Sequence, residues 1–464
     1  MVDIGRIFFE NELTINTVLG VRMRRPTTVV SSGKGVLPAF VAISLLLPLL
    51  LAGTALASDL SVSSNTYLRY YERDLAGGEK NTFAPLYEYL SADAANLGGM
   101  PVAFHFYGWG RVDLSDPSGS GKTSGEIGSA YMEYLHPQGN AQAKLGRFFL
   151  TEGAAMETID GAFAKATTPL GLGVSVYGGT PVEYSILDGT SGGSALYGAR
   201  VFFVQAGYAE IGASYLRENG TFQEGQDREL FGGDLWLRVS PAVELTAQAA
   251  YNRSVREMAS QRYAVRIRPG ATFDISAGYE SYTYKGLFQS TLNPAFVFPA
   301  LDNNDKVRTI FGIVDWAFVP GWTLEVAGKN IRHDQSDPGD ANRGEVGLRY
   351  TYNDKKDVAG IVAAFVAADR DENEYREYRG FATYSPSKIR LALDALTQRY
   401  KKEPIPGIGE KNTYQVVASA GYQVLAALKL SGDLTYTQSP NFSEDYAGLL
   451  RATVELGTTT GGTK

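Results

Sequence analysis

The ten residues from Val243 to Asn252, VELTAQAAYN, place an apolar side chain at every second position. Polar side chains fill most of the gaps between them. A helix would spread these apolar residues around its whole circumference, whereas a strand puts them all on one face. The stretch therefore predicts an amphipathic strand, although Ala, Glu, Leu and Gln are good helix formers.

The same alternation recurs along most of the chain, in segments of about 10 to 13 residues, which is longer than the five or six typical of soluble proteins. It is clear in 102–114, 234–239, 262–268, 345–353 and 428–437. Short turns alternate with longer polar connections, which include 151–156 and 438–442. Counting between them gives about 22 strands, or about 20 if segments 83–96 and 157–166 do not form strands.

This layout is typical of a transmembrane, antiparallel, up-and-down β-barrel of the bacterial outer membrane. Such barrels have an even strand number, short periplasmic turns and long outer loops. In hydrocarbon only helices and closed barrels pair every backbone group. Aromatic residues on the expected outward faces fit two interfacial girdles: Tyr251, Tyr279, Trp316, Phe318, Trp322, Tyr352, Tyr422, Tyr436 and Tyr446. A propeller would show a repeat of about 40–50 residues, and we find none.

The N-terminal region predicts a secretory signal peptide. Arg24, Arg25 and Lys34 precede an apolar run over 36–52, and the small-residue site Ala55–Ala57 follows it. We expect cleavage after Ala57 and a true start at Met23. Residues 1–57 are then an N-terminal extension and signal peptide, and residues 58–464 form the outer-membrane barrel.

Residues that carry chemistry are scarce. The chain has no Cys and only three His, namely His105, His136 and His333, which lie far apart in sequence. The stretch DPSGSGKTS resembles a phosphate-binding loop, but Asp116 stands where that motif needs Gly. A net charge of −7 argues against binding to nucleic acid. We therefore expect no enzymatic activity, no cofactor and no metal site.

Charged residues of both signs fall on the expected lumen face. Facing rows of opposite charge would create a field across a pore; the alternative is that they pair across strands and keep the wall wet. Arg262, Arg266 and Arg268 form the best candidate for an anion-attracting patch. The pore-lining candidates are Arg111, Arg200, Arg238, Glu244, Arg262, Arg266, Asp274, Arg349, Arg390 and Asp433.

A barrel of about 22 strands is wide, so something should narrow it. A TonB-dependent transporter would carry a plug domain before the barrel, but the expected first strand begins near Ser61. The long connection 285–305 carries Phe288, Phe296 and Phe298 and is our candidate for a constriction loop. This predicts a porin for passive diffusion of small polar solutes or ions.

The chain as a whole resembles outer-membrane porin-like β-barrels. The stretch KLGRFFLTEGAAMETIDGAFAKATTPLGLGVSVYGGTPVE, Lys144–Glu183, is similar to segments in barrels of metal-respiring, Geobacter-like bacteria. One departure is that such barrels usually end in an aromatic residue, whereas the last strand here ends in ATVEL.

The resemblance implies an alternative function: a barrel sheath of a porin–cytochrome conduit that encloses a multihaem cytochrome. Expected partners are the lipid bilayer with lipopolysaccharide, small polar solutes, and either further copies of the chain or a periplasmic or outer-surface cytochrome.

Overall fold

The structure is a computed structural model. It describes residues 59–74, 80–115, 123–182, 195–219, 227–287, 305–334, 339–354, 356–405, 407, 409–440 and 442–459. Neither the expected signal peptide nor the candidate constriction residues Phe288, Phe296 and Phe298 fall within these ranges.

The described chain is almost entirely β-structure. The first strands are β1 (Asp59–Asp74), β2 (Lys80–Phe83), β3 (Pro85–Ala95), β4 (Val102–Asp113), β5 (Thr123–Leu135), β6 (Ala141–Glu152), β7 (Ala155–Thr167) and β8 (Leu172–Pro181). The next are β9 (Leu196–Gln205), β10 (Ala209–Glu218), β11 (Arg228–Ser240), β12 (Val243–Asn252), β13 (Glu257–Ile267), β14 (Phe273–Thr283), β15 (Lys306–Val319) and β16 (Trp322–His333). The last are β17 (Ala341–Tyr352), β18 (Asp357–Ala368), β19 (Tyr375–Tyr384), β20 (Ile389–Tyr400), β21 (Asn412–Leu425), β22 (Leu428–Ser439) and β23 (Phe442–Thr459). Two short helices, η2 (Leu97–Gly99) and α2 (Tyr284–Leu287), complete the elements.

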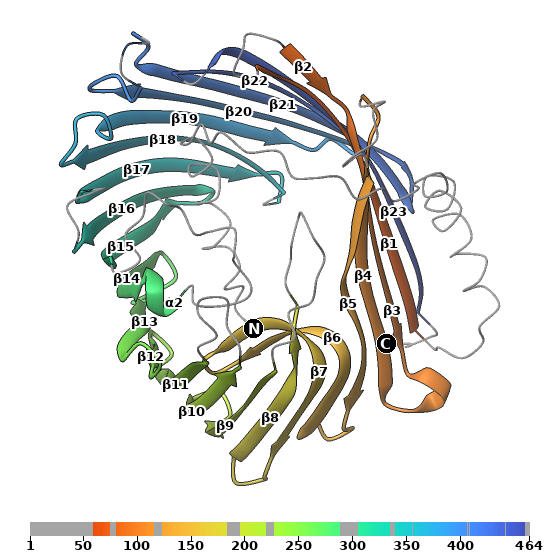
Figure 1. Ribbon diagram of the computed structural model, residues 1–464. Helices are drawn as coiled ribbons and strands as arrows, with labels where there is room; N and C mark the ends of the chain where they lie inside the picture. Colours follow the sequence, from red (N-terminus) through yellow and green to blue (C-terminus); the bar gives the residue numbers. More distant parts are fainter. Residues whose placement is uncertain are drawn as a thin grey trace, which may run out of the picture.

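These strands form one closed antiparallel barrel (Figure 1). The first strand, β1, pairs with β3 on one side and with β23 on the other, which closes the wall. Strands β2 and β3 are separated only by Ala84 and both pair with β1, so they act as one strand of the wall. The barrel therefore has 22 strands, as expected, and both weak segments form strands, as β3 and β7. No helix in the described ranges is long and apolar enough to cross a membrane.

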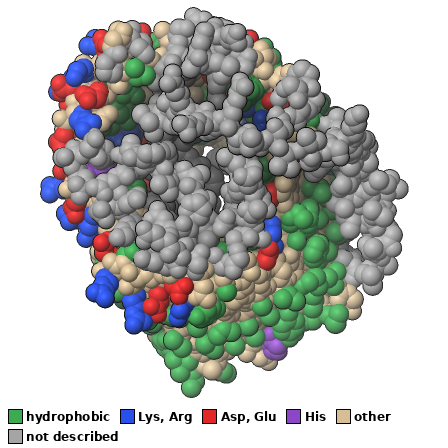
Figure 2. All heavy atoms as spheres, in the orientation of Figure 1, with side chains coloured by type: hydrophobic (Ala, Val, Ile, Leu, Met, Phe, Trp, Pro, Cys, Tyr) green, Lys and Arg blue, Asp and Glu red, His purple; other side chains and the backbone are tan. Residues whose placement is uncertain are grey.

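The two faces of the wall differ as the alternation predicts. Outward apolar side chains are widely exposed, for example Leu434 at 72% and Ile361 at 65%. The side chains of their sequence neighbours Asp433 and Val362 point to the lumen because successive side chains in a strand alternate between faces. Figure 2 shows the apolar side chains gathered over the lower wall and charged side chains around the left rim.

Outward aromatic side chains pair near both ends of the strands. At the short-turn end the rings of Phe273 and Trp316 stack with centroids 5.6 Å apart, and those of Trp322 and Tyr350 lie 4.7 Å apart. Near the long-loop end Tyr436 and Tyr446 lie 5.1 Å apart. Two aromatic belts separated by an apolar band are the pattern of a membrane-spanning barrel.

Two connections differ from the expectation. The segments 151–156 and 438–442 were expected to be long loops, but β6 and β7 are joined through Gly153 and Ala154 alone, and β22 and β23 through residues 440–441. In the first case Gly153 supplies a left-handed backbone conformation, with φ at 63°, so that a two-residue turn can form. The strict alternation of short and long connections is therefore broken at these two places.

Candidate functional site

The joined ends of β6 and β7 leave the wall and lie against its inner surface. We call residues 148–159 the inner hairpin. Its turn contacts strands far along the wall: the Ala154 backbone N–H donates to Ser214 Oγ of β10 at 2.9 Å, and Gln248 of β12 donates to the Gly153 carbonyl at 3.3 Å. In Figure 1 the two strands curve away from the wall toward β9–β11. The inner hairpin therefore reaches across part of the lumen.

The turn of the inner hairpin requires glycine for two reasons. The positive φ of Gly153 favours a residue without Cβ. A Cβ added there would lie 2.3 Å from Cβ of Ser214. Opposite, a Cβ on Gly232 of β11 would lie 2.8 Å from Cβ of Ala154. Glycine on both sides thus lets the turn seat directly on the backbone of the wall.

The inner hairpin buries an apolar underside. Phe148, Leu150 and Ile159 are at most 3% exposed, although all three sit on the lumen-facing positions of their strands. They belong to one buried cluster with side chains from the wall strands: Tyr177, Leu196, Leu216, Leu230, Ala250 and Ala259. Burying one such large apolar side chain stabilises the packed state by roughly 1.5–3 kcal/mol. This local core holds the inner hairpin against the wall.

A first group of charges surrounds Arg200 on β9, whose side chain is 5% exposed. Its guanidinium bonds Glu152 of the inner hairpin at 3.2 Å, Glu210 at 2.8 Å, and Asp234 with Nε at 3.0 Å. Lys165 approaches Glu152 at 3.5 Å. Arg200 therefore links the inner hairpin to β10 and β11.

A second group surrounds Arg228 at the start of β11, whose side chain is 7% exposed. It bonds Glu157 of the inner hairpin and Glu218 of β10, which are 1% and 0% exposed. In the two groups together, three cations face five carboxylates, which leaves an excess of two negative charges beside the inner hairpin. In a pore lining, an excess of carboxylates favours cations over anions.

On the adjoining wall, β1 and β3–β5 carry a strip of aromatic side chains on the lumen face. Tyr87 and Tyr89 are near-parallel, with centroids 6.3 Å apart, and Tyr89 and Tyr107 follow at 6.5 Å. Cations accompany the rings: Arg111 lies over Tyr87, and Lys144 over Tyr131. Tyr107 is 41% exposed. Aromatic rings and cationic side chains therefore line the lumen side by side on this part of the wall.

The histidines remain apart. His105 lies on the lumen face of β4, where Nδ1 contacts Asp93 at 2.6 Å and Nε2 contacts Glu133 at 3.1 Å. His333 contacts Asp305 at 2.7 Å, and His136 lies at a short turn. In the part of the chain that the structure describes, no group of three or more His, Asp or Glu side chains has the arrangement of a metal site.

The ten pore-lining candidates all occupy lumen-facing positions in the register, but the structure does not bring them into one site. Only Arg200 belongs to the inner hairpin contacts. The others lie around the wall, often beside opposite charges: Arg238–Glu244 at 3.7 Å, Arg262–Glu280 at 3.0 Å, Arg266–Asp274 at 2.8 Å and Arg111–Asp113 at 3.6 Å. Glu244, Arg349, Arg390 and Asp433 occupy the lumen faces of β12, β17, β20 and β22.

Two carboxylates pair with the three arginines of the proposed anion-attracting patch. Arg262 pairs with Glu280, and Arg266 and Arg268 share Asp274, the latter at 3.5 Å. This arrangement favours pairing within the wall over a free basic patch. Sequence reasoning missed the inner hairpin itself. The available signal was the run Phe148–Leu150, which is apolar on both faces where alternation predicts a polar lumen side.

No protein-family model matches the chain, and no curated protein matches it in sequence. Similar solved structures include the siderophore receptor PirA from Pseudomonas aeruginosa, at 10% identity and a TM-score of 0.54, covering 87% of this chain and 81% of that one. The P pilus usher PapC translocation pore matches at 10% identity and 0.48, over 86% and 99%. Pseudomonas aeruginosa OccK8 (OprE) matches at 10% identity and 0.39, over 87% and 100%.

At such low identity these likenesses concern the fold alone. The closed wall of 22 strands, the outward apolar band and the two aromatic belts agree with them. The protein has the fold of a bacterial outer-membrane β-barrel.

Proposed function

We propose that the protein is a channel for passive diffusion of small polar solutes or ions, and that the inner hairpin is its constriction. The observation that carries the proposal is the position of the inner hairpin, which is folded over the lumen face of β9–β12 and fixed there by Arg200 and Arg228. A lumen lined by paired charges and hydroxyls stays wet, and a narrowed wet lumen limits the size of what passes.

The electrostatics of the constriction suggest a weak preference for cations. Three cations face five carboxylates beside the inner hairpin, and the arginines on β13 are paired with carboxylates. The proposal includes no catalytic step, and the contacts of His105 with Asp93 and Glu133 are assigned to the polar lining of the wall. The wall residues then bind and orient solutes without reacting with them.

Purified protein in planar lipid bilayers tests the proposal. We expect ohmic single-channel conductance, and a several-fold larger conductance for a variant in which residues 149–158 are replaced by a short Gly-Ser turn. Leu434, an outward side chain, gives a matched control: Leu434→Ala should leave the conductance unchanged. A barrel that inserts but passes no ions would overturn the proposal.

The alternative function is the sheath of a porin–cytochrome conduit. The same purified protein can distinguish this sheath from a diffusion channel. The stretch that resembles Geobacter-like barrels, Lys144–Glu183, is the one that builds β6, the inner hairpin, β7 and β8. A silent barrel that co-purifies with haem absorbance would favour the sheath, whereas a haem-free conducting barrel would exclude it.

A further inference from the structure

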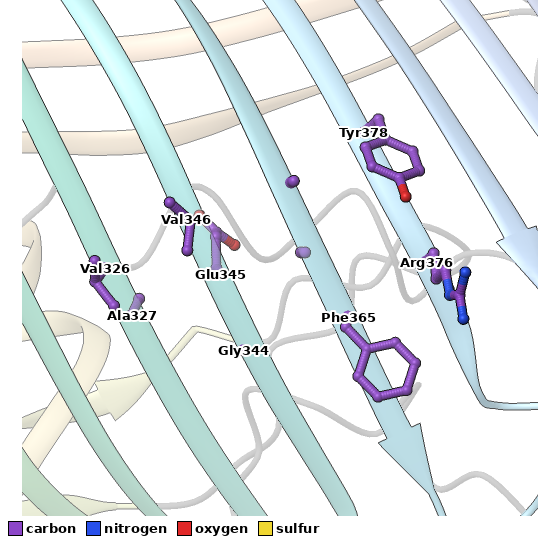
Figure 3. A pocket seen from close by; sticks show the side chains of 10 residues that line it. Val326, Ala327, Gly344, Glu345, Val346, Phe365, Arg376 and Tyr378 are labelled. Atoms are coloured by element: carbon purple, nitrogen blue, oxygen red, sulfur yellow. The ribbon is translucent and has the colours of Figure 1, made fainter.

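The outer wall carries a groove that is separate from the lumen. It lies on the outward side of β16–β19 and is bordered by Val326, Val346, Phe365 and Tyr378, with Arg376 near the start of β19 (Figure 3). The apolar members are widely exposed: Val346 at 52%, Phe365 at 44% and Tyr378 at 54%. Gly344 adds no side chain there, so the groove is open to the membrane.

Two arginines meet at the end of the groove that is formed by the start of β19. Arg376, the second residue of β19, is paired in register with Arg399 of β20, and both side chains are exposed on the outward face. Like charges directly opposite each other destabilise a sheet. No carboxylate in the described part of the chain forms an ion pair with either of them. An anion from outside the chain would relieve their repulsion.

The neighbouring carboxylates are already occupied. In the connection before β19, Asp371 and Glu374 both bind Lys401, at 2.8 and 3.1 Å, and Glu372 lies 3.8 Å from Lys402. By contrast Arg308, another outward arginine near the same rim, pairs with Asp334 at 2.9 Å. In the part of the chain that the structure describes, the pair Arg376 and Arg399 therefore differs from these neighbours because it has no carboxylate partner.

The pair lies at the end of the strands that carries the long loops. In an outer-membrane barrel these loops face the cell exterior, so the arginines meet the outer leaflet. Guanidinium groups bind phosphate through paired, charge-assisted hydrogen bonds. In a dimer, a second copy of this chain would place its own arginines at the same height in the membrane. It would not supply a negative charge to Arg376 and Arg399.

We propose that this groove binds the phosphorylated glycolipid of the outer leaflet, lipopolysaccharide. A phosphate of the lipid A moiety lies between Arg376 and Arg399, and one acyl chain lies along Phe365, Tyr378 and Val346. The acyl chain is buried along the groove and the phosphate forms charge-assisted bonds, so both interactions bind the same lipid molecule. They hold this lipid in one position among the mobile lipids around the barrel.

The test uses full-length protein purified in detergent and stripped of lipid. Native mass spectrometry measures binding of bisphosphorylated lipid A, and of the same lipid A without phosphates. We expect the double variant Arg376→Gln/Arg399→Gln to weaken binding of the phosphorylated lipid by about tenfold or more, since each lost bond to a charged group matters. Arg308→Gln, at an arginine that already has a carboxylate partner, should bind as the wild type does.

Three results would overturn the proposal: unchanged binding in the double variant, equal binding of phosphate-free lipid A, or a lipid-independent dimer of the chain that the double variant abolishes. Folding is checked separately, by the heat-modifiable gel mobility of the barrel. Bilayer conductance should be the same for the double variant and the wild type, so this proposal and the channel proposal succeed or fail independently.

Discussion

Arg228 of β11 and Glu157 of β7 form an ion pair inside the barrel, although three strands of the wall lie between them. Such a contact requires the end of β7 to leave its place in the wall. Both side chains are almost fully buried, at 7% and 1% exposure. Since buried charges are costly unless paired, this pair fixes one position of the inner hairpin.

Replacing Arg228 should release the inner hairpin. Arg228→Met removes the guanidinium that the buried Glu157 and Glu218 share, which costs about 3–5 kcal/mol. We expect higher single-channel conductance and new protease cleavage within 148–159, measured on the reconstituted protein. The triple variant Glu157→Gln/Glu218→Gln/Arg228→Met removes all three charges and should recover most of the wild-type behaviour. Unchanged conductance and cleavage in Arg228→Met would show that the pair does not hold the inner hairpin.

The two reasons for glycine at position 153, its positive φ and the close approach of Ser214, can be tested separately. Gly153→Ala adds the strain of a positive φ, about 1–2 kcal/mol, and a Cβ 2.3 Å from Cβ of Ser214. Gly139 has a similar φ of 69° and nothing within 4 Å of an added Cβ. Gly139→Ala should therefore lower the thermal midpoint slightly without altering conductance. Gly153→Ala should lower the thermal midpoint and also change the conductance. If the two variants behave identically, the turn of the inner hairpin does not pack against β10.

The excess of carboxylates at the inner hairpin should appear as ion selectivity. In a salt gradient we expect a reversal potential with the sign of cation preference for the wild type. Glu210 and Asp234 face Arg200, so Glu210→Gln/Asp234→Asn removes two negative charges from this group. We expect that variant to shift the reversal potential toward zero or toward anion preference. The remote lumen substitution Asp433→Asn should shift it less, and an equal shift would place the selectivity elsewhere.

The assignment of faces makes a simple stability prediction. Leu434 lies near the middle of β22 and is 72% exposed on the outward face. Leu434→Arg should destabilise the barrel in lipid by about 2–4 kcal/mol, because a cation near the bilayer midplane is costly. Its neighbour Asp433 faces the lumen, so Asp433→Arg should fold nearly as well as the wild type. Chemical unfolding in lipid vesicles measures both, and a reversed order would mean that the faces are exchanged.

The contact between the outer connections 369–374 and 401–411 should depend on pH. A hydrogen bond from Lys401 lowers the pKa of Asp371, and the same contact raises the pKa of Lys401. A lowered carboxyl pKa contributes stability above its ordinary value of about 4, which is lost as the pH falls through the lowered pKa. A raised lysine pKa contributes stability below about 10, which is lost as the pH rises through the raised pKa.

Distances between spin labels on these two connections should therefore be constant between about pH 5 and pH 9 and should broaden at both extremes. Lys401→Gln should broaden them at neutral pH as well. A distribution that does not change down to pH 2 in the wild type would show that the ion pair does not hold the connections together.

The sequence was sufficient for the wall and its faces. The alternation in Val243–Asn252 depends only on residues two positions apart. It can therefore be recognised without knowing the rest of the fold. It correctly predicted the closed antiparallel barrel and the number of strands. The strand register places Arg200 and Asp433 on the lumen face, and their role in lining a pore stays a prediction. The candidate constriction at Phe288, Phe296 and Phe298 lies outside the described residues and stays a prediction.

Only the closed barrel could reveal the inner hairpin. Phe148 and Ile159 break the apolar–polar alternation on the lumen face, but nothing in their own strands says what covers them. Their partners Leu196, Leu216 and Leu230 come from three strands further along the wall, and those strands face the inner hairpin only once the sheet has curved and closed. Strand pairing is set locally, whereas a contact across a lumen depends on curvature and on the register of every strand between the two sides.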